Sequence, residues 1–236
     1  MSVPIYNISH YEFRRRLKTT RRAIIPVGSL EQHGAHLPVS TDCLISERIA
    51  TLVADELKCF ILPVISFGVS FEHLPMFNVS LSNSTLSDVL CEICVSLSIQ
   101  GIKDIIFING HHGNTGVLQY ISQNVDPKIR SSIGIFAINY WNGMHRELDH
   151  AGEVETSLVL AISPRLVRMD KAEASLRKLS KSRIAYSTMT HTPGSFPKVT
   201  GNGVWGDPRG ASKEKGDTLL KEISGNLVHI ISELPQ

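Results

Sequence analysis

Residues 23–42 read Ala23-Ile-Ile-Pro-Val-Gly-Ser-Leu-Glu-Gln-His-Gly-Ala-His-Leu-Pro-Val-Ser-Thr-Asp42, and the fold can be worked out from this stretch. Its apolar run, 23–30, is typical of a buried strand that passes directly into a polar loop. That loop carries Glu31, His33 and Asp42. A second apolar run, 104–109, passes in the same way into Asn109-Gly-His-His-Gly-Asn114. We therefore expect two buried strands, each followed by a loop of chemically active side chains.

Short apolar runs alternate with amphipathic segments along the chain. The predicted strands are 23–30, 60–67, 104–109 and 133–140. The predicted helices are 44–57, 86–100, 115–124, 152–162 and 212–234. For the helix 86–100, the expected N-cap is Ser84 or Thr85 and the expected C-cap is Gly101. For the helix 115–124, the expected N-cap is Asn114. This alternation predicts an α/β fold with a mainly parallel central sheet covered by helices on both faces.

The bulk composition is that of an ordinary globular protein. At 236 residues, the chain suits a single domain spanning residues 1–236. Hydrophobic residues make up 42% and charged residues 19%, and the net charge of +2 favours neither a nucleic-acid nor a membrane partner. No apolar run is long enough to cross a bilayer and no signal-peptide pattern is present, so we expect a cytoplasmic protein.

The four cysteines do not show the regular spacing of a disulfide framework, which agrees with the expected cytoplasmic location. Cys91-Glu-Ile-Cys94 lies inside a predicted helix, so we interpret the pair as packing rather than as a redox or zinc site. Cys43 follows Asp42 directly, and we interpret it as a packing residue as well.

The predicted topology brings the polar loops together. In parallel α/β sheets, ligands bind beyond the carboxyl ends of the strands. Four loops that carry histidines leave the predicted strands at this edge: 28–42, 67–73, 109–114 and 140–152. The segment 190–210 is rich in Gly, Pro, Thr and Ser, and we expect either a long ordered loop or a lid over the site.

Carboxylates and imidazoles in these loops form a mixed ligand set that suits zinc, manganese or iron better than calcium. The predicted metal ligands are Glu31, His33, Asp42, His111 and Glu153. Asp42 can bridge two ions through its two oxygens, and Glu153 would supply the fifth ligand that a second ion needs. Two divalent ions about 3.5–4 Å apart would hold a bridging hydroxide as the nucleophile and polarise a carbonyl oxygen.

His150 is the candidate general acid that protonates the departing nitrogen. A structural histidine bonded to a backbone carbonyl is the alternative for His150. Glu155 is the second candidate catalytic residue, expected to orient His150 or a metal ligand. The candidate substrate-binding residues are His112, Glu72, His73, Trp141 and Arg146. For Glu72 and His73 an exposed ion pair is an equally good interpretation. His36 and His112 each adjoin a predicted ligand, and for both a role facing a carbonyl or the substrate is at least as good an interpretation as a ligand role.

The combined motifs resemble the creatininase family of metal-dependent amidohydrolases. The matching stretches are 26–38 with Thr41-Asp42, 108–114 and 150–157, with a weaker match over 203–216. The resemblance implies a three-layer α/β/α fold, two divalent ions per subunit, hydrolysis of an amide C–N bond and a homohexamer. By position, it assigns Glu31, Asp42 and His111 to one ion, with Asp42 bridging and His33 on the other. It also assigns proton transfer to His150.

Three departures separate the chain from creatininase proper. Gly113 stands where creatininase has a glutamate ligand, so we expect Glu153 to replace that ligand. Arg146 stands where creatininase has a tryptophan over the substrate, and Trp141 is the nearby indole. Met76-Phe-Asn-Val79 replaces the family's Phe-Pro-Gly-Thr segment. We therefore do not expect creatinine itself as the substrate.

The predicted function is cleavage of a formamide or cyclic amide in a small polar molecule by metal-bound hydroxide, with His150 as proton donor. One candidate is a formamide deformylase of flavin or deazaflavin biosynthesis, in which Arg146, Lys198 and Arg209 would bind a phosphate. Lactam ring opening and trimming of a short peptide are the alternatives. A metal-binding assembly protein without turnover is the rival from another class, against which the candidate acid His150 argues. A nucleotide-binding domain would carry a glycine-rich signature that is missing here.

Overall fold

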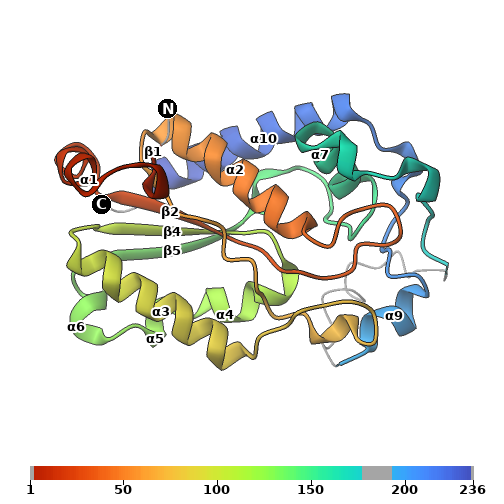
Figure 1. The fold of residues 1–236 in the computed structure, drawn as a ribbon, viewed down its shortest axis with the longest axis horizontal. Helices are drawn as coiled ribbons and strands as arrows, with labels where there is room; N and C mark the ends of the chain where they lie inside the picture. The colour runs from red at the N-terminus through yellow and green to blue at the C-terminus, as the bar shows by residue number, and fades with distance from the viewer. Residues whose placement is uncertain (1–2, 177–192, 235–236) are drawn as a thin grey trace.

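The computed structural model describes residues 3–176 and 193–234, and its centre is a parallel sheet (Figure 1). In sheet order, the strands of this part of the chain are β1 (Val3–Pro4), β3 (Phe60–Ile61), β2 (Arg22–Val27), β4 (Asp104–Asn109) and β5 (Gly134–Asn139). β2 and β4 pair in register from Arg22 opposite Asp104 to Val27 opposite Asn109. The predicted parallel α/β sheet is therefore confirmed.

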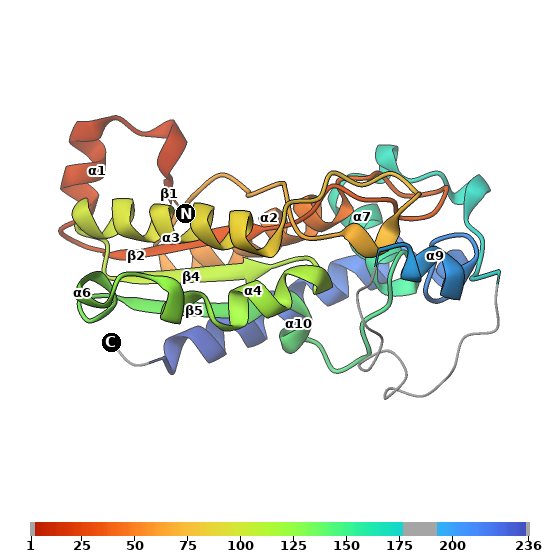
Figure 2. The same cartoon turned by 90° about the horizontal axis from the view of Figure 1, so that it is seen from below.

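Helices cover both faces of the sheet (Figures 1 and 2). One face carries α2 (Thr41–Leu57), α7 (Glu153–Ile162) and α10 (Lys213–Ser232). The other carries α1 (His10–Arg16), α3 (Asn83–Ile99), α4 (Thr115–Gln119), α5 (Ile121–Asn124) and α6 (Pro127–Arg130). Successive strand residues point to opposite faces, so Ile24 and Ile106 join the first core while Ile25 and Phe107 join the second. The result is the expected three-layer arrangement.

The second predicted strand, 60–67, is shorter than expected because β3 ends at Ile61. Pro63 has no N–H to donate to the ladder. Pairing with β2 resumes only as an isolated bridge between Val27 and Ile65.

Helix starts differ from the sequence prediction at two places that matter for the site. α2 begins at Thr41 rather than Leu44, so Asp42 lies in its first turn instead of in a loop. α3 is capped by Ser82, whose hydroxyl accepts the Thr85 N–H at 3.1 Å, so the predicted caps were wrong. At its other end the C-cap is Gln100 rather than Gly101, which follows it with a φ of 99°.

The predicted helix 115–124 is divided at Tyr120 into α4 and α5. Asn114 does not cap α4 through its side chain. Its amide oxygen accepts the Val69 N–H at 3.0 Å and its NH₂ donates to the Gly28 carbonyl at 3.0 Å. Asn114 therefore ties together the loops that follow three different strands.

The segment 190–210 is partly helical. Residues 190–192 lie outside the described residues; the remainder holds α9 (Ser195–Thr200) and a 3-10 helix, Pro208–Gly210. Trp205 forms an antiparallel bridge with His150, with N···O distances of 3.0 and 2.7 Å. This pairing fixes the segment against a loop that carries a predicted site residue.

The cysteines are free thiols, as their spacing predicted. Cys94 is buried in the core under α3, and the Cys43 thiol donates to the Ser29 carbonyl at 3.3 Å. In the described ranges, no helix has the length and apolar character that crossing a membrane requires.

Candidate active site

One pocket lies beyond the carboxyl ends of β2, β4 and β5, where the loops predicted to converge meet. It is lined by Glu31, Asp42, Glu72, His73, Gly110, His111, His112, Trp141, Leu148, Asp149, His150, Glu155 and Phe196. α9 contributes Phe196 from the end of the chain. Most of these residues are polar, although the pocket is surrounded by the buried core.

Three groups of side chains at this pocket could each hold a metal ion: two of them share Asp42, and the third consists of Glu31, His33 and His150. The first group consists of Glu31, Asp42 and His111. His111 Nδ1 lies 3.3 Å from Glu31 Oε2 and 3.2 Å from Asp42 Oδ2. In the second group, His33 Nε2 lies 3.1 Å from Asp42 Oδ1 and 3.7 Å from Glu155 Oε2. Asp42 therefore presents one oxygen to each of the two groups that share it.

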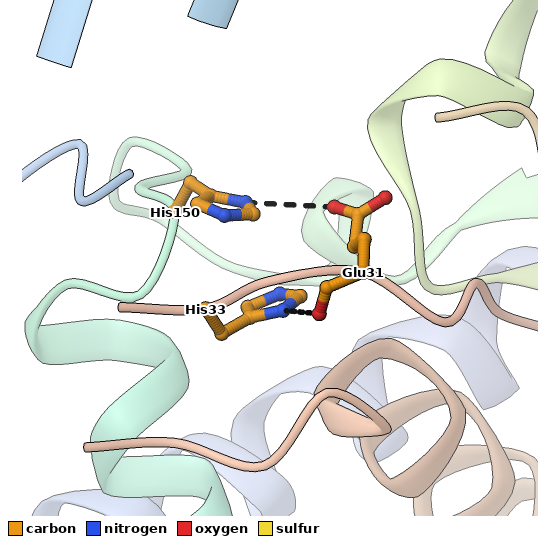
Figure 3. A group of neighbouring side chains, drawn as sticks. All are labelled: Glu31, His33 and His150. Carbon is orange, nitrogen blue, oxygen red and sulfur yellow. Dashed lines mark hydrogen bonds and ion pairs between the residues drawn. The ribbon is translucent and has the colours of Figure 1, made fainter. Parts of the chain in front are cut away.

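Backbone carbonyls orient both imidazoles toward the carboxylates. His111 Nε2 donates to the Val69 carbonyl at 2.7 Å, which leaves Nδ1 facing the first group. His33 Nδ1 donates to the Glu31 carbonyl at 3.1 Å, which leaves Nε2 facing the second group (Figure 3). Metal-bound histidines usually donate their other nitrogen in this way, because that bond fixes the tautomer and the ring orientation.

Buried oxygens in the pocket lack the partners that burial normally requires. Both carboxylate oxygens of Glu31 and Oδ2 of Asp42 are buried without a hydrogen bond. The nearby nitrogens of His73 and His111 lie 3.1–3.3 Å from these oxygens and are oriented as ion pairs rather than as hydrogen bonds. Burying carboxylates in this way is costly unless positive charge lies beside them. The residues present therefore fit a cation held between Glu31 and Asp42.

The electrostatics of the pocket also favour positive charge between the ligands. Burial opposes a charge on His33, but the carboxylates of Asp42 and Glu155 outweigh it and raise its pKa to about 10. Burial raises the pKa of Glu155 to about 8, although His33 opposes that shift. The carboxylates of Asp42 and Glu155 therefore favour a positive charge at the position of His33.

The structure places Glu153 away from the other predicted metal ligands. Its side chain is 38% exposed and pairs with Lys215 Nζ at 2.6 Å, outside the pocket. Two residues along a helix are about 200° apart around its axis, so Glu153 and Glu155 point to opposite sides of α7. Glu155 is the residue that joins His33 and Asp42, and its Oε2 also accepts the Ala151 N–H at 2.6 Å.

His150 lies directly above His33 at the edge of the ligand groups (Figure 3). The two rings stack with centroids 4.2 Å apart. His150 Nε2 donates to the Gln32 carbonyl at 3.1 Å, and Nδ1 lies 3.8 Å from Glu31 Oε1. Burial, together with His33 and His73, holds the pKa of His150 well below its ordinary value. The imidazole is therefore neutral, with its Nδ1 lone pair facing the ligands.

Four of the five predicted substrate-binding residues line the pocket: Glu72, His73, His112 and Trp141. His73 Nε2 is 3.1 Å from Glu31 Oε1, so the interpretation of Glu72 and His73 as an exposed pair is wrong; both are buried. His112 stacks on Trp141 with ring centroids 6.0 Å apart.

The fifth predicted residue, Arg146, is exposed and is not part of the pocket wall. Lys198 is also exposed, and Arg209 pairs with Asp207 at 2.6 Å. None of the three cations proposed for a phosphate therefore lines this pocket. Arg146 follows η4 (Tyr140–Gly143) and the buried Met144, and it lies in the exposed stretch 145–147.

Sequence reasoning missed Gln32, Asp149 and Phe196. Gln32 Nε2 donates to His73 Nδ1 at 2.9 Å and to the Gly203 carbonyl at 3.0 Å. The Asp149 carboxylate accepts the N–H groups of Val154 at 2.9 Å and Glu155 at 3.4 Å. An aspartate just before a predicted helix is a capping signal that could have identified Asp149. No comparable signal marked Gln32 or Phe196.

His36, whose role the sequence leaves open, does not line the pocket. Its Nε2 lies 2.9 Å from the Thr156 hydroxyl. Burial, with His33 nearby, lowers its pKa to about 4, so it is neutral. It packs α7 against the loop that carries the metal ligands.

Comparison with known proteins gives a consistent assignment. The sequence model described as "Creatininase: Creatinine amidohydrolase" matches residues 7–231. The mycofactocin precursor peptide peptidase of Mycobacterium ulcerans is 30% identical, covering 89% of this chain and 84% of the relative. A 2-amino-5-formylamino-6-ribosylaminopyrimidin-4(3H)-one 5'-monophosphate deformylase of Methanococcus voltae is 30% identical but covers only 46% of this chain and 42% of the relative.

Among solved structures, the crystal structure of creatinine amidohydrolase superimposes with a TM-score of 0.85 at 23% identity, covering 100% of this chain and 99% of the other. That likeness concerns the fold, and it agrees with the parallel sheet and its two helical layers. The family match, by contrast, extends over all the loops that build the pocket. The protein belongs to the creatininase family of hydrolases, in which relatives named as amidohydrolase, peptidase and deformylase act on C–N bonds.

Proposed function

We propose that this protein is a dinuclear metal-dependent amidohydrolase that cleaves a C–N amide bond in a small polar substrate. The observation that carries the proposal is the pair of ligand groups, Glu31 with His111 and His33 with Glu155, that share Asp42. The buried oxygens of Glu31 and Asp42 that accept no hydrogen bond support the presence of cations. Zinc, iron and manganese all suit this mixture of carboxylate and imidazole ligands.

When bound, two such ions polarise an amide carbonyl and lower the pKa of a water molecule. The chain's own residues supply the proton transfer. His150 is neutral and presents Nδ1 to the pocket, so it can accept a proton during attack and return it to the departing nitrogen. The bond from Nε2 to the Gln32 carbonyl keeps the ring in this orientation.

Glu155 and Asp149 fix the position of these groups. Glu155 accepts the Ala151 N–H beside His150 while it faces His33. Asp149 caps the start of α7, on which Glu155 lies. The same short segment therefore positions a metal ligand and the proton carrier, so that neither can move independently of the other.

Two observations favour an unphosphorylated amide, such as one in a short peptide, over the ribosyl formamide. None of Arg146, Lys198 and Arg209 lines the pocket, which removes the proposed phosphate contacts. The relatives named as peptidases also match 85–92% of the chain, whereas those named as deformylases match 42–46%. A formamide or lactam is the second candidate.

The test combines metal analysis with a substrate screen. The purified chain is loaded with Zn²⁺, Mn²⁺ or Fe²⁺ and its bound metal is measured. Each form is then incubated with short peptides, formamides and lactams, and released amine is quantified. We expect two ions per chain and turnover in one of the three amide classes. Fewer than one ion per chain would contradict the dinuclear site, and two bound ions without amine release would contradict the activity.

A further inference from the structure

A groove continues outward from the catalytic pocket. Its first section shares Glu72 and His112 with the pocket wall, and it passes over Gly113 to Gly116. Its second section shares Gly116 and Asn83 with the first and ends near Tyr120. The groove is lined by residues of α3 and α4, which contact each other. Both helices lie on the same side of the sheet (Figure 2).

The space at the metal ligands is much smaller than the groove. The cavity there is about 20 Å³, which is room for about one water molecule. The two groove sections have cavity volumes of about 390 and 620 Å³. The reacting bond fits beside the ligands only if the rest of the substrate lies elsewhere, and the first groove section is the neighbouring space, because it shares Glu72 and His112 with the pocket wall.

The groove wall indicates which chemistry it would bind. Hydroxyl and amide side chains predominate in its outer section, among them Ser84, Ser87 and Asn124. Its charged carboxylates are Glu72 and Asp88, and no lysine or arginine in the described ranges lines it. Tyr120, 52% exposed, supplies an aromatic surface at the outer end. Such a wall suits an uncharged or cationic chain with its own hydrogen-bonding groups, and it disfavours phosphate.

The geometry points to this groove as the binding site for the remainder of an extended, peptide-like amide substrate whose reacting bond lies at the metal ligands. The inference rests on the proposed function, because it takes the ligand groups as the place of reaction. Beyond that function, we infer that affinity for the substrate increases with its length, because the added residues bind along α3 and α4.

Gly116 allows the groove to be blocked without disturbing the core. A Cβ added at Gly116 would meet no atom within 4 Å, and the position lines both groove sections. Gly225 in α10 provides a matched control: a Cβ there also meets nothing within 4 Å, but the position faces a separate hollow beside Lys221. The test variants are therefore Gly116→Met and Gly225→Met.

The probes are acetohydroxamic acid and two series of hydroxamates, which bind metal and carry one to five uncharged residues on either side of the chelating group. Their dissociation constants are measured on metal-loaded protein. We expect one series to bind at least about tenfold more tightly at its longest than at its shortest, equivalent to about 1.4 kcal/mol. Gly116→Met should abolish this gain and Gly225→Met should retain it.

A second variant guards against misfolding of the first. Tyr120→Ala removes the aromatic surface at the outer end, so it should weaken only the longest probes. Equal affinity at every length in both series, or a gain that survives Gly116→Met, would refute the groove while leaving the metal centre intact. If acetohydroxamic acid does not bind at all, the metal centre is refuted, and the groove inference with it.

Discussion

Replacing Glu155 with glutamine tests the metal site most directly, because the chain offers Glu153→Gln as a matched control. Glutamine keeps the shape of Glu155 and can still accept the Ala151 N–H, but it has no negative charge for a cation. The second ligand group would retain only His33 and Asp42. We expect Glu155→Gln to bind one ion per chain where the unaltered protein binds two.

The magnitude follows from linkage between binding and folding. An ion whose free concentration is a thousand times its Kd stabilises the folded state by about 4.1 kcal/mol. For a chain of 236 residues, about 1 kcal/mol shifts the Tm by roughly 2–4 °C. Losing one of the two ions should therefore reduce the metal-dependent rise in Tm by about 8–16 °C.

Glu153→Gln should behave differently. It removes an exposed ion pair with Lys215, worth about 0–1 kcal/mol, and it does so equally with and without metal. The metal-dependent rise in Tm should then stay the same. Calorimetry with and without Zn²⁺, together with metal analysis, gives both quantities. The reasoning is refuted if Glu155→Gln keeps two ions, or if Glu153→Gln loses one.

Three further substitutions address other parts of the site. Asp42→Asn should lose both ions, because Asp42 faces both ligand groups; retention of either ion by metal analysis would exclude a bridging role. His150→Asn should keep both ions while kcat falls about 10²–10⁴-fold, and loss of an ion would instead identify His150 as a ligand. Gly113→Ala should weaken the first ion site, because a Cβ there would collide with the Val69 carbonyl and the His111 ring; unchanged affinity in a metal titration would contradict that crowding.

The predictable part of the site followed from the chain's periodicity. Strand–helix alternation indicated a parallel sheet, and the sheet explains why Glu31 and His111, far apart in sequence, lie within 3.3 Å of each other. The register of β2 against β4 could not be deduced from either strand alone. It places Val27 opposite Asn109 and so aligns the two loops.

The choice between Glu153 and Glu155 could not be made from spacing. Both follow His150 closely, and both belong to the first turn of α7. Only the helix's rotation about its axis decides which one faces His33, and that rotation depends on packing of α7 against α2 and α10. The prediction that Arg146 lines the pocket has a related weakness. Whether a loop residue points inward depends on contacts with residues that are distant in sequence.

The position of Asp42 relative to His111 depends on the sheet and on the close approach of the loop after β4 to the start of α2. Asp42 is held in the first turn of α2, and His111 follows β4 after a single residue, Gly110. A Cβ at Gly110 would collide with the Asp42 carbonyl, so glycine allows the β4 loop to pass directly over the start of α2. That passage places His111 Nδ1 3.2 Å from Asp42 Oδ2. The geometry of this candidate ion site therefore depends on a contact between main chains as well as on its side chains.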